Sequence, residues 1–282
     1  MQNKLLTIVM VSFHSETMLK RLIPLIPKEY KIIVTDNART KSLKDDLEKK
    51  FTNTKVLIPK KNLGNGDGVN FALRNTKTKY VLYLDVDIIL KKNFFKDMIL
   101  NANLNRNWAI LAPNIKNYNY HEKNFILKKR SKNIFEMNFV EGCALLFNMN
   151  TMKKIGFYDK KIFLYFEEND LFVRCLKKNK SILLVKDIFI SHIGNASANK
   201  KYQEEIEINR NWHYMWSKFY FYKKHHSSFV GFKKTIPHFF KAMIKCVILF
   251  LFNKKKFNIY KARFSGLWSS YCNKPSAMRP RI

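Results

Sequence analysis

Two aspartates stand at the end of an apolar run, where they could hold a divalent cation. Residues 80–84 are aromatic, β-branched or aliphatic, which is typical of a buried strand, and Asp85-Val86-Asp87 follows directly. Open α/β sheets bind ligands at the carboxyl ends of their strands. Two carboxylates there could coordinate a hard cation, which in turn could hold a diphosphate. Aspartate is also favoured in turns and helix caps, so the triplet alone leaves both interpretations open.

A second group of acids lies at Glu167-Glu168-Asn169-Asp170. Neighbouring carboxylates raise one another's pKa, and burial does the same, so one of them could act as a general base. The alternative is an acidic first turn of a helix, which the helix dipole stabilises. The residues that follow have helical spacing, so both interpretations place the acids at a helix N-terminus.

The elements that must position these acids alternate between strands and helices. We predict strands at 5–11, 30–35, 55–58 and 80–84, with helices between them at 16–26, 41–51 and 68–75. This alternation is typical of βαβ units and a parallel sheet. Further strands are predicted at 108–112, 139–147 and 181–185, and helices at 170–178 and from about residue 204. The run at 5–11 is too short for a signal peptide and lacks a cleavage site, so it is interpreted as the first strand.

Glycine placement argues against a dinucleotide-binding loop. No G-x-G-x-x-G follows the first strand, and the glycine-rich stretch at 62–68 lacks the Gly-Lys-Ser/Thr of a phosphate loop. That stretch could still bring backbone amides close to a ligand at the start of the next helix. It could equally be an ordinary turn with several positive φ angles.

Composition predicts one large domain, or one domain with a substantial appendage. The chain has 282 residues, of which 46% are hydrophobic and 15% aromatic, enough for a folded core. Its four cysteines are scattered without a C-x-x-C pair, which excludes a zinc knuckle and argues against a disulfide framework. No stretch approaches the length of a membrane span.

Charge is strongly positive and unevenly placed. The formal net charge is +32, and the 75 residues after Glu207 carry sixteen Lys or Arg and no acid. A polyanionic partner is therefore expected, either nucleic acid or an anionic membrane surface. Compositional drift toward lysine is the alternative, although it explains less easily the complete loss of acids from one end.

Taken in order, several short motifs resemble those of one enzyme family. They are Ser12 after the first strand, Asp36-Asn37, Asn62-x-Gly64 with Asn70, Asp85-Val86-Asp87, Glu141-Gly142-Cys143, Gly156-Phe157-Tyr158-Asp159, Glu167 to Asp170 with Arg174, His192-x-Gly194 with Ser197, and Asn209-Arg210-Asn211. Over about residues 5–220 the chain resembles inverting glycosyltransferases of family 2 with the GT-A fold. The likeness is strongest to bacterial rhamnosyltransferase-like enzymes of cell-surface polysaccharide synthesis.

The resemblance implies an α/β fold and a division of the chain. A GT-A domain, Rossmann-like with a mainly parallel mixed sheet, is expected over 1–205 and binds the nucleotide sugar. A basic, aromatic, helical C-terminal extension is expected over 206–282. The activity implied is metal-dependent transfer of rhamnose or another hexose from a nucleoside diphosphate donor to a glycan or glycolipid acceptor, as in lipopolysaccharide synthesis.

The resemblance also implies roles for single residues. Asp87 would bind Mn²⁺ or Mg²⁺, Asp85 would contact the metal or the ribose, and His192 would be a third metal or diphosphate ligand that favours Mn²⁺. Taken alone, His192 would be a satisfied core residue. The remaining residues expected to bind the donor are Ser12, Asp36, Asn62, Gly64, Asn70, Arg174 and Arg210. Asp36 could instead cap a turn, and the two arginines could be packing or surface residues.

The general base is expected in the acid cluster. Related enzymes usually have Glu-Asp-x-Asp there, with the second residue as base, whereas this chain has Glu168 at that place. The base is therefore expected to be Glu168, with Asp170 as the alternative and Glu167 beside them. This base would take the proton of the acceptor hydroxyl.

Two interpretations of the C-terminal region remain. In the first, residues 229–252 form an amphipathic helix that holds a cytoplasmic enzyme on the inner face of the cell membrane. The alternative for that helix is packing on the catalytic domain or on a second subunit of a homo-oligomer. In the second interpretation, the protein binds nucleic acid through aromatic residues interleaved with lysines. No nucleic-acid-binding module accompanies them, and this function leaves the two acid groups unexplained.

Overall fold

Four parallel strands form the first half of a mixed sheet in this computed structural model, which describes residues 5–116, 118, 120, 125–193 and 202–280. The order is β3-β2-β1-β4, and every pairing is parallel, with bounds β1 (Leu6–Ser12), β2 (Lys31–Asp36), β3 (Thr54–Leu57) and β4 (Tyr80–Leu84). All five residues of β4 are buried. A strand covered on both faces needs an unbroken apolar run, which is how the sequence encodes it.

The second half of the sheet is mixed. Next to β4 lies β9 (Ala144–Asn148), antiparallel to it and to β6 (Trp108–Ile115), and β6 pairs in parallel with β10 (Ser181–His192). Antiparallel strands complete the sheet: β8 (Ile134–Met137), β7 (Ile126–Lys129) and the short β5 (Ile88–Ile89), which pairs with the end of β10. The two longest ladders, β1–β2 and β6–β10, are parallel, so the predicted GT-A-like α/β fold is confirmed.

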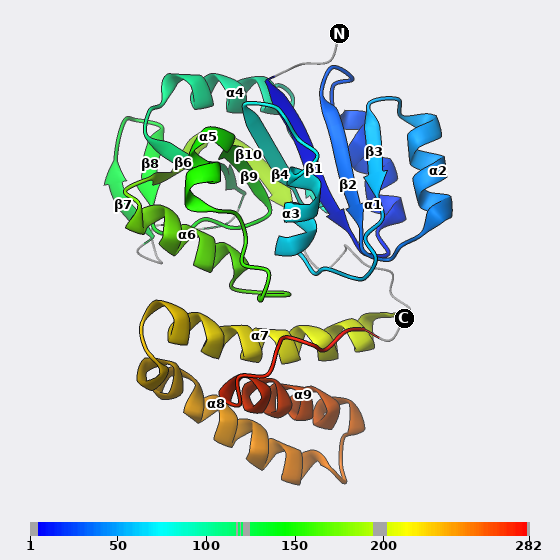
Figure 1. Ribbon diagram of the computed structural model, residues 1–282, viewed down its shortest axis with the longest axis vertical. Helices are drawn as coiled ribbons and strands as arrows, with labels where there is room; N and C mark the ends of the chain where they lie inside the picture. Colours follow the sequence, from blue (N-terminus) through cyan, green and yellow to red (C-terminus); the bar gives the residue numbers. More distant parts are fainter. Residues whose placement is uncertain (1–4, 117, 119, 121–124, 194–201, 281–282) are drawn as a thin grey trace. The chain divides into compact units, whose positions relative to one another are not determined.

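Helices alternate with the strands along the chain (Figure 1). They are α1 (Glu16–Leu22) with the 3-10 turn η1 (Ile23–Leu25), α2 (Lys41–Lys50), α3 (Gly66–Leu73), α4 (Phe94–Leu104), α5 (Met149–Ile155) and α6 (Glu167–Lys177). In α2, Leu43 and Leu47 are buried four residues apart, on one face of the helix. Both belong to the main hydrophobic core, together with residues of β1, β2 and β4.

The chain divides into two compact units. The sheet unit contains residues 1–63, 68–157 and 171–198, and the helical unit contains 64–67, 158–170 and 199–282. The predicted boundary at 205/206 stays a prediction. In the helical unit, α7 (Gln203–His225), α8 (Ser228–Leu249) and α9 (Lys254–Tyr271) contact one another (Figure 1). The helices α7 and α9 approach closely at Gly266, where a Cβ would lie 2.4 Å from the carbonyl oxygen of Trp212.

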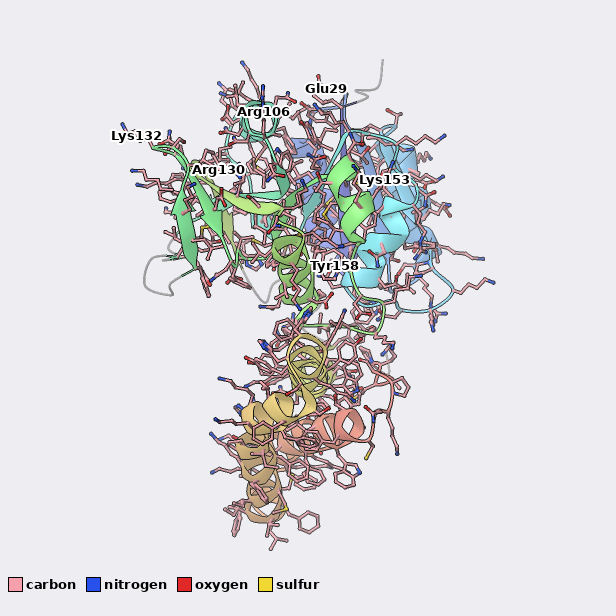
Figure 2. The ribbon with its side chains drawn as sticks, turned by 60° about the vertical axis from the view of Figure 1, so that its left-hand side comes forward. Glu29, Arg106, Arg130, Lys132, Lys153 and Tyr158 are labelled. Atoms are coloured by element: carbon pink, nitrogen blue, oxygen red, sulfur yellow. The ribbon has the colours of Figure 1, made fainter. Side chains whose placement is uncertain are left out.

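Two predicted strands differ from the structure, and other elements were not predicted. The strand predicted at 139–147 begins only at Ala144, and the strand predicted at 181–185 continues to His192. The β7–β8 hairpin was not predicted. Arg130 and Lys132 lie at its turn (Figure 2), and the Arg130 guanidinium donates to Glu136 Oε1 at 2.5 Å and Ser181 Oγ at 2.7 Å. This tertiary anchoring holds a hairpin whose own sequence has little strand pattern.

Candidate active site

Three potential metal ligands meet at the carboxyl edge of the sheet. The ligand atoms of Asp85, Asp87 and His192 lie within 4.8 Å of one another. His192 Nε2 lies 3.1 Å from Asp87 Oδ1 and 3.8 Å from Asp85 Oδ2. Two carboxylates and an imidazole fit a divalent cation, and the nitrogen ligand suits Mn²⁺ better than Mg²⁺. The predicted cation site is therefore formed by the residues that the sequence singled out.

Local pairing brings His192 to the aspartates. The chain leaves β4 at Leu84, passes the acidic triplet and forms β5, which pairs with the end of β10 in the register His192↔Ile88. The amide of Ile193 also donates to the carbonyl oxygen of Asp87 at 3.1 Å. The imidazole is thus fixed beside the acids by backbone hydrogen bonds on both sides.

Asp85 is held by its surroundings. Its amide donates to the carbonyl oxygen of Cys143 at 2.8 Å, and the Tyr83 hydroxyl donates to its Oδ1. Burial of the carboxylate raises the pKa of Asp85 to about 6, which the Tyr83 hydrogen bond partly opposes. The side chain still keeps 33% of its surface exposed, so one edge of the carboxylate can reach a ligand.

The pKa of His192 is raised as well, but by a different cause. Its hydrogen bond to Asp87 raises the pKa of the imidazole, and burial opposes that rise. Asp87 itself is 3% exposed. A cation on this triad would have to displace the imidazole proton, because a metal binds the neutral ring.

Two further predicted residues end the neighbouring strands. Ser12 and Asp36 are paired in the β1–β2 register and are fully buried. Among the described residues, Ser12 Oγ has no hydrogen-bond partner. The Asp36 carboxylate instead accepts the amide protons of Ala38 at 3.3 Å and Thr40 at 2.7 Å, so it caps the turn into α2. Its contact with a nucleotide base stays a prediction.

The glycine-rich stretch is shaped by close approach of backbone to backbone. Gly64 has φ +78°, and a Cβ there would lie 2.0 Å from the carbonyl oxygen of Phe163, so only glycine fits. Asn70 lies in α3 and is buried, and Asn62 is half-buried in the loop before it. Donor contacts by Asn62, Gly64 and Asn70 stay predictions.

The acid cluster begins α6 after a strained turn. Tyr165 and Phe166, just before the helix, both have left-handed backbones at φ 64° and 67°. Aromatic packing against α7 holds this conformation, since both rings contact Tyr214 at centroid distances of 5.6 Å. A left-handed backbone conformation costs free energy at a non-glycine residue, and such strained residues are found preferentially at functional sites.

Members of the acid cluster differ sharply in their surroundings. Asp170 is completely buried, and its Oδ1 accepts from Lys224 Nζ at 2.5 Å and His225 Nε2 at 2.8 Å. Glu167 is 2% exposed, whereas Glu168 is half-buried. Asp170 is therefore engaged by cations of α7, and Glu168 is the acid of the cluster that solvent reaches most easily.

With this geometry in view, the family can be assigned. The model of "Glycosyl transferase family 2" matches residues 7–166, more than half of the chain. This chain belongs to glycosyl transferase family 2. No curated protein matches its sequence.

Solved structures share the fold of this family 2 chain. A mannosyltransferase, PcManGT of Pyrobaculum calidifontis with GDP-Man and Mn²⁺, has a TM-score of 0.62 at 10% identity, with 97% of this chain and 88% of that one covered. Residues 1–349 of TarS from S. aureus give 0.56 at 14% identity, covering 96% and 92%. GalNAc-T7 with UDP, GalNAc and Mn²⁺ gives 0.56 at 14%, covering 81% and 56%. These identities support the fold alone.

The two arginines predicted to bind the donor have different surroundings in the family 2 chain. Arg174 donates to the carbonyl oxygens of Ile155 at 3.3 Å, Gly156 at 2.9 Å and Phe157, so it fixes the turn after α5. Arg210 lies half-buried on α7, and its positive charge lowers the pKa of Tyr165 against the larger effect of burial. Donor binding by either arginine stays a prediction.

Sequence reasoning missed three residues that support the site. Tyr83 shares a strand face with Asp85, because residues two apart on a strand point the same way, so this signal was present in the sequence. Lys224 and His225 lie more than fifty positions after Asp170. No local pattern could have connected them with the acid cluster.

Proposed function

We propose that this chain is a metal-dependent inverting glycosyltransferase that moves a sugar from a nucleoside diphosphate donor to a growing glycan. The observation that carries the proposal is the Asp85, Asp87 and His192 group at the strand ends of a family 2 chain. Two structural neighbours add support, since the mannosyltransferase is in complex with GDP-Man and Mn²⁺, and GalNAc-T7 is with UDP, GalNAc and Mn²⁺. Mn²⁺ or Mg²⁺ is the proposed cofactor.

In the proposed reaction, Glu168 takes the proton of the acceptor hydroxyl. The freed oxygen attacks the anomeric carbon, the bond from that carbon to the donor phosphate breaks, and the nucleoside diphosphate leaves with inversion at the carbon. A bound divalent cation would neutralise the charge that develops on the leaving group. Asp85, Asp87 and His192 would hold that cation, and Ser12 Oγ, which has no hydrogen-bond partner among the described residues, would hydrogen-bond the donor.

Glu168 is preferred to Asp170 as the base because of accessibility. Asp170 is completely buried and its Oδ1 already accepts from Lys224 and His225, whereas Glu168 is half-buried and can be reached by an acceptor hydroxyl. Glu168→Gln keeps the shape and removes the proton acceptor, so turnover should fall by about 10² or more with donor binding little changed. Loss of donor binding instead would show that Glu168 has a structural role.

The donor and acceptor are proposed from the resemblance alone. We propose rhamnose or another hexose as the sugar, and a lipid-linked cell-surface polysaccharide or lipopolysaccharide as the product. The test is a panel of nucleoside diphosphate sugars, incubated with the full chain and Mn²⁺ and scored for hydrolysis or transfer. If the chain is active with any donor and a chelator abolishes that activity, the result supports the proposed transferase function. If the chain is inactive with every donor of the panel, the result counts against it.

We further propose that the helical unit binds the cytoplasmic face of an anionic membrane. Along α8, large apolar side chains are exposed, from Phe229 at 76% to Val247 at 76%. The turn after α8 is more exposed still, with Leu251 at 80% and Phe252 at 81%, and three lysines follow at 254–256. Among the described residues, no helix is long and apolar enough to cross a membrane.

The exposed apolar and basic side chains of this surface suit an anionic membrane better than a nucleic acid. Exposed apolar patches of this kind mark interaction sites, and each lysine near an anionic surface adds about 1 kcal/mol. The nucleic-acid alternative rested on the aromatic rings between the lysines of α7, and of these Trp212, Trp216 and Phe219 are buried in the bundle, so they are not available for stacking. A glycan carried on a lipid would be presented at the same surface.

Sedimentation with anionic vesicles tests the membrane proposal. Leu251→Ser with Phe252→Ser removes two side chains whose full burial would each contribute about 1.5–3 kcal/mol, so vesicle binding should fall at least tenfold. The matched control is Leu100→Ser with Leu104→Ser, on exposed positions of α4 in the sheet unit. Equal binding by the test and control variants would contradict the proposal.

A further inference from the structure

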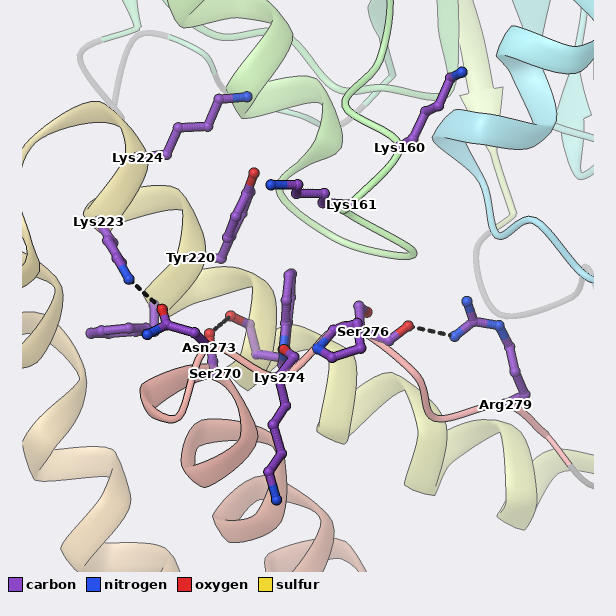
Figure 3. A pocket seen from close by; sticks show the side chains of 13 residues that line it. Lys160, Lys161, Tyr220, Lys223, Lys224, Ser270, Asn273, Lys274, Ser276 and Arg279 are labelled. Atoms are coloured by element: carbon purple, nitrogen blue, oxygen red, sulfur yellow. Dashed lines mark hydrogen bonds between the residues drawn. The ribbon is translucent and has the colours of Figure 1, made fainter.

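A basic pocket of about 670 Å³ lies within the helical unit (Figure 3). It is bordered by the turn at 160–161, by α7 and by the segment that follows α9. No acidic side chain lines it among the described residues, whereas six basic ones do: Lys160, Lys161, Lys223, Lys224, Lys274 and Arg279. Such a concentration of one charge sign is costly unless an anion compensates it.

The wall of the pocket is aromatic and ordered. Trp216 and Tyr220, one turn apart on α7, stack with ring centroids 5.0 Å apart. The Trp216 indole donates to the carbonyl oxygen of Lys274 at 3.0 Å, which ties the final segment to α7. His213 does the same further along, contacting Ser276 Oγ at 2.9 Å and the carbonyl oxygen of Met278 at 2.8 Å. The pocket is therefore a built feature of the fold.

One of its cations is already paired. Lys224 Nζ lies 2.7 Å from Asp159 Oδ2 and 2.5 Å from Asp170 Oδ1. Asp159 also accepts from the Tyr220 hydroxyl at 2.9 Å. This pairing stabilises the unit and leaves the remaining cations of the pocket to be explained.

Three of the other cations have no acidic side-chain partner among the described residues. Within the described part of the chain, no carboxylate oxygen lies within 4 Å of the cationic nitrogens of Lys161, Lys223 or Arg279; Lys223 donates to the Asn273 side-chain carbonyl. The Arg279 guanidinium donates to the carbonyl oxygen of Ser276 at 2.8 Å and lies 3.7 Å over the Phe163 ring. Burial without a counter-charge lowers the pKa of Arg279 to about 10.

We propose that this pocket binds a phosphate-bearing ligand, and that it is distinct from the predicted nucleotide site at Asp85 and Asp87. Phosphate oxygens accept several hydrogen bonds at once, which lysine and arginine supply as charge-assisted donors. The half-buried ring of Tyr220 would cover an apolar part of the same ligand. The bound phosphate would also contact Lys224, the residue that holds Asp170 in the acid cluster.

Inorganic pyrophosphate is the first probe, titrated by calorimetry into the full chain with chelator present. Lys161 is exposed, and among the described residues only its backbone amide, not its amine, contacts a carboxylate, that of Asp159, so Lys161→Gln should fold normally and bind the probe about tenfold more weakly. Lys223→Gln should have a similar effect. Lys233→Gln is the matched control, because Lys233 is an exposed lysine of α8 outside the pocket. Melting temperatures establish that each variant is folded.

Further arms separate this pocket from the donor site and identify the ligand source. Asp87→Ala should leave metal-free pyrophosphate binding unchanged, and loss of pyrophosphate binding in that variant would overturn the proposal. Equal pyrophosphate affinity of Lys161→Gln and the Lys233→Gln control would overturn it as well. Failure of the transferase assay would not affect this result, because neither metal nor sugar is present. Glycerol phosphate in solution and phosphatidylglycerol vesicles then distinguish a soluble phosphate ester from a lipid headgroup. Sensitivity of either one to Lys161→Gln supports the proposal, and insensitivity of both contradicts it.

Discussion

Affinity for Mn²⁺ should fall steeply as the pH is lowered, because the cation competes with protons for two of its three ligands. The pKa of His192 is raised above its usual 6.5 by Asp87, and burial raises that of Asp85 to about 6. Both shifts keep protons on the ligands at mildly acidic pH. A metal requires both groups deprotonated, so lowering the pH weakens binding.

The size of the effect follows from these pKa values. Between pH 8 and pH 5, protonation of His192 should cost about 30-fold in affinity or more, and protonation of Asp85 about tenfold. The product is a loss of about 300-fold for the wild-type chain. His192→Gln removes the imidazole from the competition and should retain only the tenfold part, whereas Asp85→Asn should retain only the 30-fold part.

The assay is the electron paramagnetic resonance signal of free Mn²⁺, titrated at several pH values between 5 and 8. Asp87→Asn serves as the variant in which binding itself should be lost, since Asp87 is the most buried of the three ligands. An affinity that stays constant from pH 8 to pH 5, or wild-type affinity in Asp87→Asn, would refute the assignment of these residues as ligands.

Three other predictions concern stability and can be checked by denaturant unfolding with matched variants. Asp170→Asn should cost about 1.5–3 kcal/mol, because it removes the charge of the buried carboxylate that accepts from both Lys224 and His225; a loss below about 0.5 kcal/mol would contradict this. Burial lowers the pKa of His213 to about 3, below the usual 6.5, so between these values only the unfolded chain binds a proton at this residue. The stability that neutral His213 contributes is therefore complete above pH 6.5, and the free energy of unfolding should decline by up to about 1.4 kcal/mol per pH unit below it. His213→Gln should abolish this dependence. Gly64→Ala should destabilise far more than Gly156→Ala, because both positions have positive φ but only at Gly64 would a Cβ meet a backbone carbonyl; equal losses would show that only backbone strain matters.

The parallel half of the sheet was predictable because its strands are nearly continuous apolar runs. All of β4 and most of β1 and β2 are buried on both faces, so each strand is visible in the sequence without its neighbours. The antiparallel half gave weaker signals. In β7, only Ile126 is even half-buried, and the strand is held by the pairing with β8 rather than by its own pattern.

The candidate site was predictable in part, and the limit lies in sequence distance. Asp85 and Asp87 could be placed from the strand that precedes them. Their contact with His192, 105 positions later, depends on the β5–β10 pairing, and β5 is only two residues long. The predicted role of His192 therefore came from the family resemblance. Residues 194–201, which include Gly194 and Ser197 of the same motif, lie outside the described part of the chain.

The positive charge of the C-terminal region serves different purposes at different positions, which weakens any inference from its total. Lys224 neutralises buried acids within its own unit, so it contributes to stability and cannot also be counted toward an external polyanion. Lys161 and Lys223 face a pocket with room for a small anion. The lysines beside exposed apolar residues, on α8 and at 254–256, are available for an extended surface. Because their attraction to lipid is screened by salt and the apolar contacts are not, vesicle binding should weaken at high ionic strength without disappearing. A nucleic acid held by charge alone would be released under the same conditions.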